Sequence, residues 1–143
     1  MRIRLLSALF ASAFLGLTTF SLHSETIKLK APLNAASEVP AKDSQGKGEV
    51  TATLDTETKV FQYQVTFSDL TGPATAAHFH GPAGAGVNAK PTVPLKSPVT
   101  SPLSGEATLS DEQVKELLAG QWYFNVHTAK NPGGEIRGQL VRE

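Results

Sequence analysis

The most restrictive feature of this chain is a strict alternation of apolar and polar residues over short stretches. The alternation is clearest in KVFQYQVTFSDL, where Phe61, Tyr63, Val65 and Phe67 are separated by polar residues. Because successive side chains of a β-strand point to opposite faces, this period of two predicts a strand with one buried face. TIKLKAPLNA and GEVTATLD show the same pattern. The short polar link DTET joins GEVTATLD to KVFQYQVTFSDL and predicts a hairpin between these two strands.

Further strand candidates follow along the chain. ATAAHFH, SGEATL, QWYFNVHT and GEIRGQLVR are expected to be strands, while the two prolines of KPTVPL restrict it to a sheet edge. About eight short strands with frequent turn signals predict an all-β fold, an antiparallel β-sandwich or a partly closed barrel. Residues 80–105 are rich in Gly, Pro and Ser, which predicts a long surface excursion with little structure of its own.

One short helix is expected near residues 110–119, in SDEQVKELLAG. Ser110 is placed as its N-cap and Gln113 lies three residues later, which is the pattern of a capping box. Apolar residues three and four positions apart form one stripe along this segment. Gly120 can adopt the left-handed conformation that ends a helix.

The first 24 residues have the layout of a secretory signal peptide. Arg2 and Arg4 precede an apolar run and then small polar residues. The run is short for a membrane span, and no second apolar run follows. The sequence therefore predicts a periplasmic or secreted protein, with one folded domain over residues 25–143 and no membrane span after cleavage. The alternative is an uncleaved N-terminal anchor.

Composition narrows the possible chemistry. The chain has 143 residues, and loss of Arg2 and Arg4 leaves 11 of its 13 Lys and Arg against 13 Asp and Glu, a net charge of about −2. The lysines are scattered, so nucleic acid is not an expected partner. The absence of cysteine excludes thiol nucleophiles, iron–sulfur clusters and thiolate zinc sites. A metal would have to be held by histidine, carboxylate, amide or backbone oxygen.

Three histidines follow the predicted leader, and all lie in predicted strands. In AAHFHGPAG, His78 and His80 flank Phe79, so the two imidazoles share one strand face. In QWYFNVHT, His127 falls on the face opposite the apolar Trp122 and its alternate neighbours. The three imidazoles therefore lie opposite the core side of their own strands, and they can converge if the two strands are neighbours.

Convergence of these imidazoles predicts a metal site at His78, His80 and His127. Imidazole is a common ligand for copper and zinc, and a set of three leaves a position open for water, Asn125 or a carboxylate. Cu(II) is favoured over Zn(II), because the affinity of nitrogen sites peaks at copper in the divalent series. Catalysis is not expected, since the chain has no nucleophile-elbow pattern and no evident carboxylate pair. Redox turnover at a copper site is left open.

The C-terminal stretch NVHTAKNPGGEIRGQL combines a turn signal with two charged residues. Residues 131–134 predict a turn that joins the last two long strands as a hairpin. Glu135 and Arg137 are expected to form an ion pair with each other or with a neighbouring strand, and to set its register. Gly138 predicts a bulge or a close backbone approach.

Four stretches together resemble one known family, the CHRD domain, which is named after chordin. They are LNAASEVP, GKGEVTATLD, AHFHGPAG and the FNVHT…NPGGEIRGQL run, and the resemblance covers about residues 27–142. It implies a β-sandwich of immunoglobulin-like or superoxide-dismutase-like character in an exported protein, without an established activity. The three histidines belong to the motifs that carry the resemblance.

Two functions from different classes are consistent with these observations. The first is an exported metal-binding protein for copper storage, delivery or tolerance. The second is a non-catalytic interaction module that binds another exported protein or an envelope polymer through residues 80–105 and an exposed sheet face. In the second case the histidines bond to turn backbone and fix the corner at Gly81 and Pro82.

Overall fold

The computed structural model describes residues 24–143, so the predicted signal peptide lies outside the described residues except for Ser24. The elements, in chain order, are β1 Thr26–Asn34, the 3-10 turn η1 Ala35–Ser37, β2 Lys47–Asp55, β3 Val60–Ser68, β4 Ala74–His80, β5 Pro91–Pro94, β6 Leu103–Thr108, α1 Asp111–Leu118, β7 Tyr123–Thr128, β8 Ile136–Gln139 and β9 Val141–Arg142.

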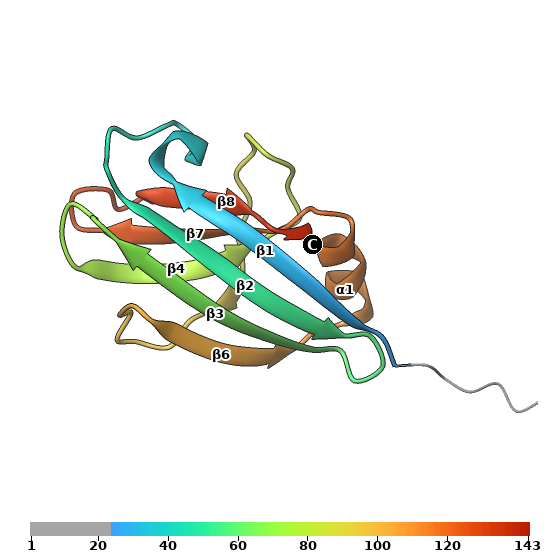
Figure 1. Ribbon diagram of the computed structural model, residues 1–143. Coiled ribbons are helices and arrows are strands. Elements are labelled where there is room, and N and C mark those ends of the chain that lie inside the picture. The colour runs from blue at the N-terminus through green and yellow to red at the C-terminus, as the bar shows by residue number, and fades with distance from the viewer. Residues whose placement is uncertain (1–23) are drawn as a thin grey trace, which may run out of the picture.

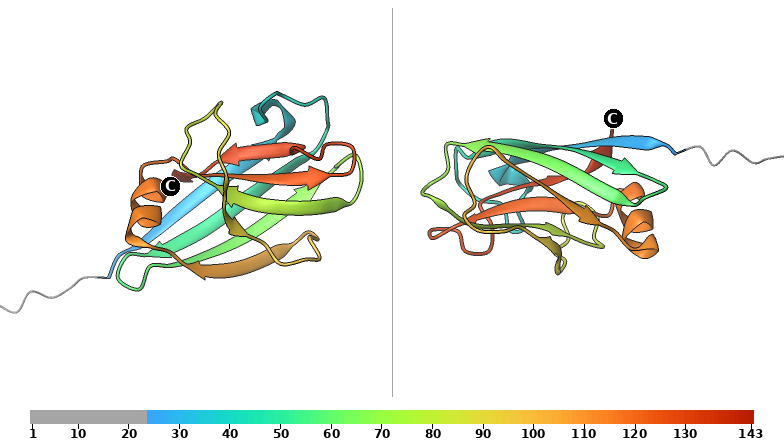
Figure 2. Two further views of the ribbon diagram at one scale, coloured as in Figure 1. Left: turned by 180° about the vertical axis from the view of Figure 1, so that it is seen from behind. Right: turned by 90° about the horizontal axis from the view of Figure 1, so that it is seen from below.

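The nine strands of residues 24–143 all belong to one antiparallel sheet. Its order is β5-β4-β7-β8-β1-β2-β3-β6, and β9 pairs with β1 outside this path. The sheet curls so that β4, β7 and β8 lie behind β1, β2 and β3, as Figures 1 and 2 show. The all-β antiparallel prediction is confirmed, but the shape is close to a barrel rather than clearly a sandwich. The reason is that β1 pairs with β8 as well as β2, which joins the two layers along one side.

The core follows from the period of two. Every second residue of β1 is buried, and β1 pairs with β2 over its whole length. Across the barrel Phe61 of β3 meets Phe79 of β4 edge-to-face, with ring centroids 5.1 Å apart. Trp122 and Phe124 complete this aromatic centre and are fully buried. Burial of each large apolar side chain stabilises the fold by about 1.5–3 kcal/mol.

The predicted helix and its cap are confirmed in α1. The Ser110 hydroxyl accepts from the Gln113 backbone N–H, and the Gln113 side chain accepts from the Ser110 N–H. Leu117 is buried against the core, and Gly120 follows with a φ of +71°. The helix covers one end of the barrel (Figure 2). Over residues 24–143, no helix is both long and apolar enough to cross a membrane.

The Gly- and Pro-rich segment has more structure than its composition predicts. It contains β5, which pairs only with β4 and lies at the sheet edge, as its prolines require. Before β5, residues 81–90 (the 81–90 loop) fold back across the outer face of β7 and β8 (Figure 2, left). There the Ala83 carbonyl accepts from the Gln139 side chain.

The close backbone approach predicted at Gly138 is confirmed, and it occurs between β8 and β1. A Cβ atom at this position would collide with the Pro32 carbonyl of β1. The missing side chain therefore allows β8 to lie against β1 where the two layers join.

Glu135 is fully buried and does not pair with Arg137, contrary to the ion pair expected from sequence. It lies in the turn before β8, and no salt bridge within residues 24–143 includes either residue. The carboxylate instead accepts hydrogen bonds of 2.6–3.1 Å from the side chains of Ser44, Thr71, Thr128 and Asn131 and from the backbone of Thr71. Burial alone would raise the pKa of Glu135, but these bonds lower it to about 2.

We expect Glu135→Gln to lower the free energy of unfolding by about 2–3 kcal/mol at neutral pH. The substitution replaces an acceptor with an amide nitrogen among groups that can mainly donate, which leaves buried donors unpaired. Because the folded pKa of Glu135 is depressed, its stabilising effect is complete above about pH 4.5 and is lost as the pH falls toward 2.

Chemical unfolding at neutral pH and at about pH 3 measures both effects. The matched control is Glu49→Gln, an exposed carboxylate on β2, which should change stability by less than about 0.5 kcal/mol. Equal stabilities for the Glu135 and Glu49 variants would contradict the structural role of the buried carboxylate.

Candidate metal centre

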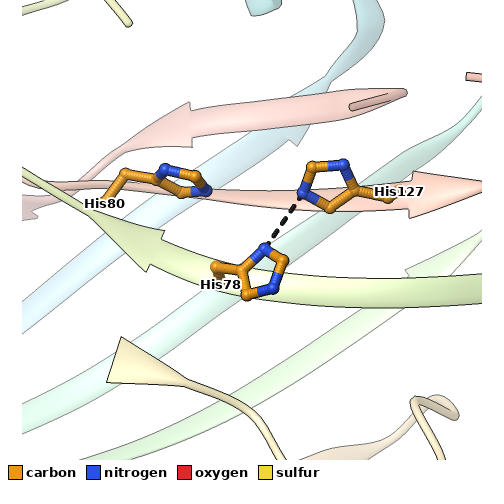
Figure 3. A group of neighbouring side chains, drawn as sticks. All are labelled: His78, His80 and His127. Carbon is orange, nitrogen blue, oxygen red and sulfur yellow. Dashed lines mark hydrogen bonds between the residues drawn. The ribbon is translucent and has the colours of Figure 1, made fainter. Parts of the chain in front are cut away.

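The pairing of β4 with β7 brings the three histidines together. His78 lies opposite Asn125, His80 opposite Tyr123, and Ala76 opposite His127. All three imidazoles project from the same outer face of these two strands, as Figure 3 shows. The face assigned to each histidine from the sequence agrees with this arrangement, and β4 and β7 are neighbours, which was the condition for convergence.

The three imidazoles are close enough for their nitrogen atoms to bind one metal ion. His78 Nδ1 lies 3.1 Å from His127 Nε2 (Figure 3). The ring centroids are 5.0 Å apart for His78 and His127, 5.5 Å for His78 and His80, and 6.4 Å for His80 and His127. One candidate ligand nitrogen from each residue lies within 4.8 Å of the other two.

Backbone carbonyls fix the orientation of two of the rings. His80 Nδ1 lies 2.9 Å from the Ala89 carbonyl, and His127 Nδ1 lies 2.9 Å from the Pro132 carbonyl. A carbonyl oxygen can only accept, so each Nδ1 carries a hydrogen and each neutral ring has its lone pair on Nε2. Histidines that bind metals commonly donate their second nitrogen in this way.

Asn125 lies against the free nitrogen of His80. The distance from His80 Nε2 to Asn125 Oδ1 is 3.0 Å. When His80 donates through Nδ1, these two atoms are both acceptors and their lone pairs face each other. A cation held by both atoms removes this conflict, and so does a half-turn of the amide that brings its NH₂ group to His80.

Glu38, in the loop after η1, lies beside Asn125. Its carboxyl group is buried, and its Oε1 has no hydrogen-bond partner among the described residues. Burial raises the pKa of Glu38, although the neighbouring Asn125 amide and the charge of Arg137 act in the opposite direction. Gly134 passes directly over this contact, and a Cβ there would collide with both the carboxyl group and the amide.

The outer face of β7 is a buried polar layer rather than an exposed surface. Tyr123, Asn125 and His80 are all buried, whereas His78 and His127 are partly exposed. The cluster is therefore closed on the His80 side and accessible from the side of the other two histidines.

The period of two in QWYFNVHT places Tyr123 on the same face as Asn125 and His127, and the structure confirms this position beside His80. Sequence reasoning missed Glu38 and Arg137 as neighbours of this cluster. No local signal marks Glu38 or Arg137, because a charged residue in a turn or strand is ordinarily solvated.

Burial lowers the pKa of both His78 and His80. For His78, the nearby His127 and His80 lower the pKa further. For His80, hydrogen bonds to Ala89 and Asn125 act in the opposite direction without cancelling the effect of burial. Both rings are thus held as neutral imidazoles at neutral pH, the form that binds metals.

These features define a class: a small antiparallel β-domain with a half-buried three-histidine cluster on the outer face of its sheet. The model of the CHRD domain family matches residues 29–140, and the chain belongs to this family. The match confirms the resemblance seen in the sequence. No curated protein and no solved structure matches the chain.

We expect the free energy of unfolding of the metal-free protein to fall as the pH is lowered from about 7.5 toward 5. The pKa values of His78 and His80 are depressed in the folded state, so in this window the unfolded chain binds more protons than the folded protein. Protonation therefore favours unfolding.

Chemical unfolding at several pH values in a chelating buffer measures this slope. The double variant His78→Gln, His80→Gln should show a flatter dependence than the unsubstituted protein. The same slope in both proteins would contradict the assignment of depressed pKa values to these two rings.

Proposed function

We propose that this protein is an exported metal-binding protein that holds Cu(II) at His78, His80 and His127 for storage, delivery or tolerance. One observation carries the proposal: three imidazole nitrogens lie within 4.8 Å of one another. Two of these rings already donate Nδ1–H to backbone carbonyls, as histidines that bind metals commonly do.

The ligand atoms follow from the hydrogen bonds. His80 and His127 would bind through Nε2, and His78 through the Nδ1 atom that faces His127. His78 can keep a neutral ring by carrying its hydrogen on Nε2 instead. Nitrogens about 2.0–2.1 Å from one ion lie about 3–4 Å apart, so the His78–His127 pair already has the required spacing. A small movement of His80 completes the set.

The fourth position would be filled by Asn125 Oδ1 or by water. The amide oxygen is 3.0 Å from His80 Nε2, which is an ordinary separation for two ligands of one ion. A cation bound by both atoms would remove the conflict between these two acceptors, as would a half-turn of the Asn125 amide in the metal-free protein.

Copper is the proposed ion because a set of imidazole and amide ligands has its highest affinity for Cu(II) among the divalent first-row metals. Zn(II) accepts the same ligands and is the second choice. We assign no reaction to this site, and redox turnover of bound copper is not part of the proposed function.

Export is proposed from the first 24 residues alone. Arg2 and Arg4, the apolar run and the small residues before Glu25 form a signal-peptide pattern. Delivery of the metal would then involve another exported protein as the recipient.

A second candidate is the non-catalytic interaction module. The bonds from His80 to Ala89 and from His127 to Pro132 favour it, because they fix two loops without any metal. In this case the histidines would be structural, and the partner would be another exported protein or an envelope polymer.

We expect the protein to bind one Cu(II) with sub-micromolar affinity, and Zn(II) more weakly, in calorimetric titrations at neutral pH. His78→Ala, His80→Ala and His127→Ala should each abolish this binding, because each removes one of three ligands. Bound metal should also raise the melting temperature by mass action.

Thr75→Ala, at an exposed position of the same strand, is the control and should bind like the unsubstituted protein. Millimolar affinity with melting insensitive to metal would contradict the metal-binding proposal and leave the interaction module as the better account.

A further inference from the structure

Arg137 is a buried cation whose hydrogen bonds go to one loop. Its side chain is 1% exposed, and no salt bridge within residues 24–143 includes it. The guanidinium donates to Asn88 Oδ1 at 3.0 Å and to the Val87 carbonyl at 2.7 Å, with a longer contact of 3.5 Å to the Gly84 carbonyl. These three acceptors all belong to the 81–90 loop, so Arg137 ties this loop to β8.

The same guanidinium begins a column of stacked groups that ends at a histidine of the cluster. Arg137 Cζ lies 3.4 Å from the centre of the Tyr123 ring. On its other side, Tyr123 stacks on His80 with centroids 4.7 Å apart and planes 4° from parallel. The His80 ring therefore rests on a tyrosine that is itself held from behind by Arg137.

Loop and column meet again at Ala89. The Tyr123 hydroxyl accepts from the Ala89 N–H at 3.1 Å and donates to the Ala89 carbonyl at 3.3 Å. That carbonyl also accepts from His80 Nδ1 at 2.9 Å. The atom that sets the tautomer of His80 is thus positioned by a loop that Arg137 holds.

We propose that Arg137 is a positioning residue for His80: it fixes the 81–90 loop and the Tyr123 ring so that His80 donates through Nδ1 and presents Nε2 to a metal ion. The effect of Arg137 on metal binding rests on the proposed function. Its effect on the orientation and tautomer of the His80 ring is present in the metal-free protein and can be tested there.

The geometry requires arginine rather than a generic cation. A guanidinium is planar, so it can stack on Tyr123 and donate from its edge to several loop acceptors at once. A lysine ammonium keeps the charge but cannot do both. Arg137→Lys and Arg137→Gln should therefore have similar effects, although only the second removes the charge.

The first experiment measures the tautomer of His80 in the metal-free protein at about pH 8, where the ring is neutral, by long-range ¹H–¹⁵N correlation NMR. We expect the hydrogen on Nδ1 in the unsubstituted protein and a mixture of tautomers in Arg137→Gln and Arg137→Lys. The second experiment measures Cu(II) and Zn(II) affinity by calorimetry, where the same variants should lose about 10–100-fold.

The matched control is Val87→Ala, which shortens an exposed side chain of the loop and keeps the carbonyl that Arg137 contacts. It should leave the tautomer and the affinity unchanged. If the Arg137 variants do not fold, Asn88→Ala removes one loop acceptor from an exposed position and should shift both readouts in the same direction.

A His80 ring that keeps its hydrogen on Nδ1 in every folded variant overturns the proposal. Unchanged metal affinity in the Arg137 variants, beside tight binding by the unsubstituted protein, also overturns it. If the unsubstituted protein binds no metal, the proposed function fails, and the tautomer measurement alone decides the role of Arg137.

Discussion

The antiparallel register between β4 and β7 is the constraint on which the candidate site depends. It places His78 opposite Asn125 and His80 opposite Tyr123, with His127 two residues beyond Asn125 and opposite Ala76. Because side chains alternate between faces, a shift of one residue would turn one strand's polar residues into the core and its aromatic residues outward. The buried Phe79 and Phe124, which pair in the same register, therefore stabilise the arrangement of the histidines as well as the core.

The outer face of these strands carries a second buried layer built from polar groups. Burying such groups is unfavourable unless they are hydrogen-bonded, and here His80 Nδ1 donates to the Ala89 carbonyl and Arg137 donates to the 81–90 loop. This layer is closed by loops rather than by strands. The histidines of this layer are positioned by the strands that carry them and by hydrogen bonds to loop carbonyls. Such fixed side chains make a preorganised metal site.

Much of the fold could be predicted from the sequence because a period of two is a local signal. The alternation in KVFQYQVTFSDL, the capping box at Ser110 and the turn before Glu135 each act within a few residues. The joining of the two layers into one curled sheet could not be predicted, since it depends on whether β1 pairs with β8. The face of the histidines was also predictable. The burial of Glu135 and Arg137 was not, because it arises from the 81–90 loop and from side chains distant in the chain, and Glu135 and Arg137 alone suggested a surface ion pair.

The central claim is that one metal ion is bound by His78, His80 and His127 together. Anomalous diffraction from crystals of the protein grown with Cu(II) tests it most directly. The account predicts a single strong anomalous peak about 2.0–2.1 Å from one nitrogen of each ring. A peak elsewhere on the molecule, or no peak beside three hydrogen-bonded rings, would contradict it.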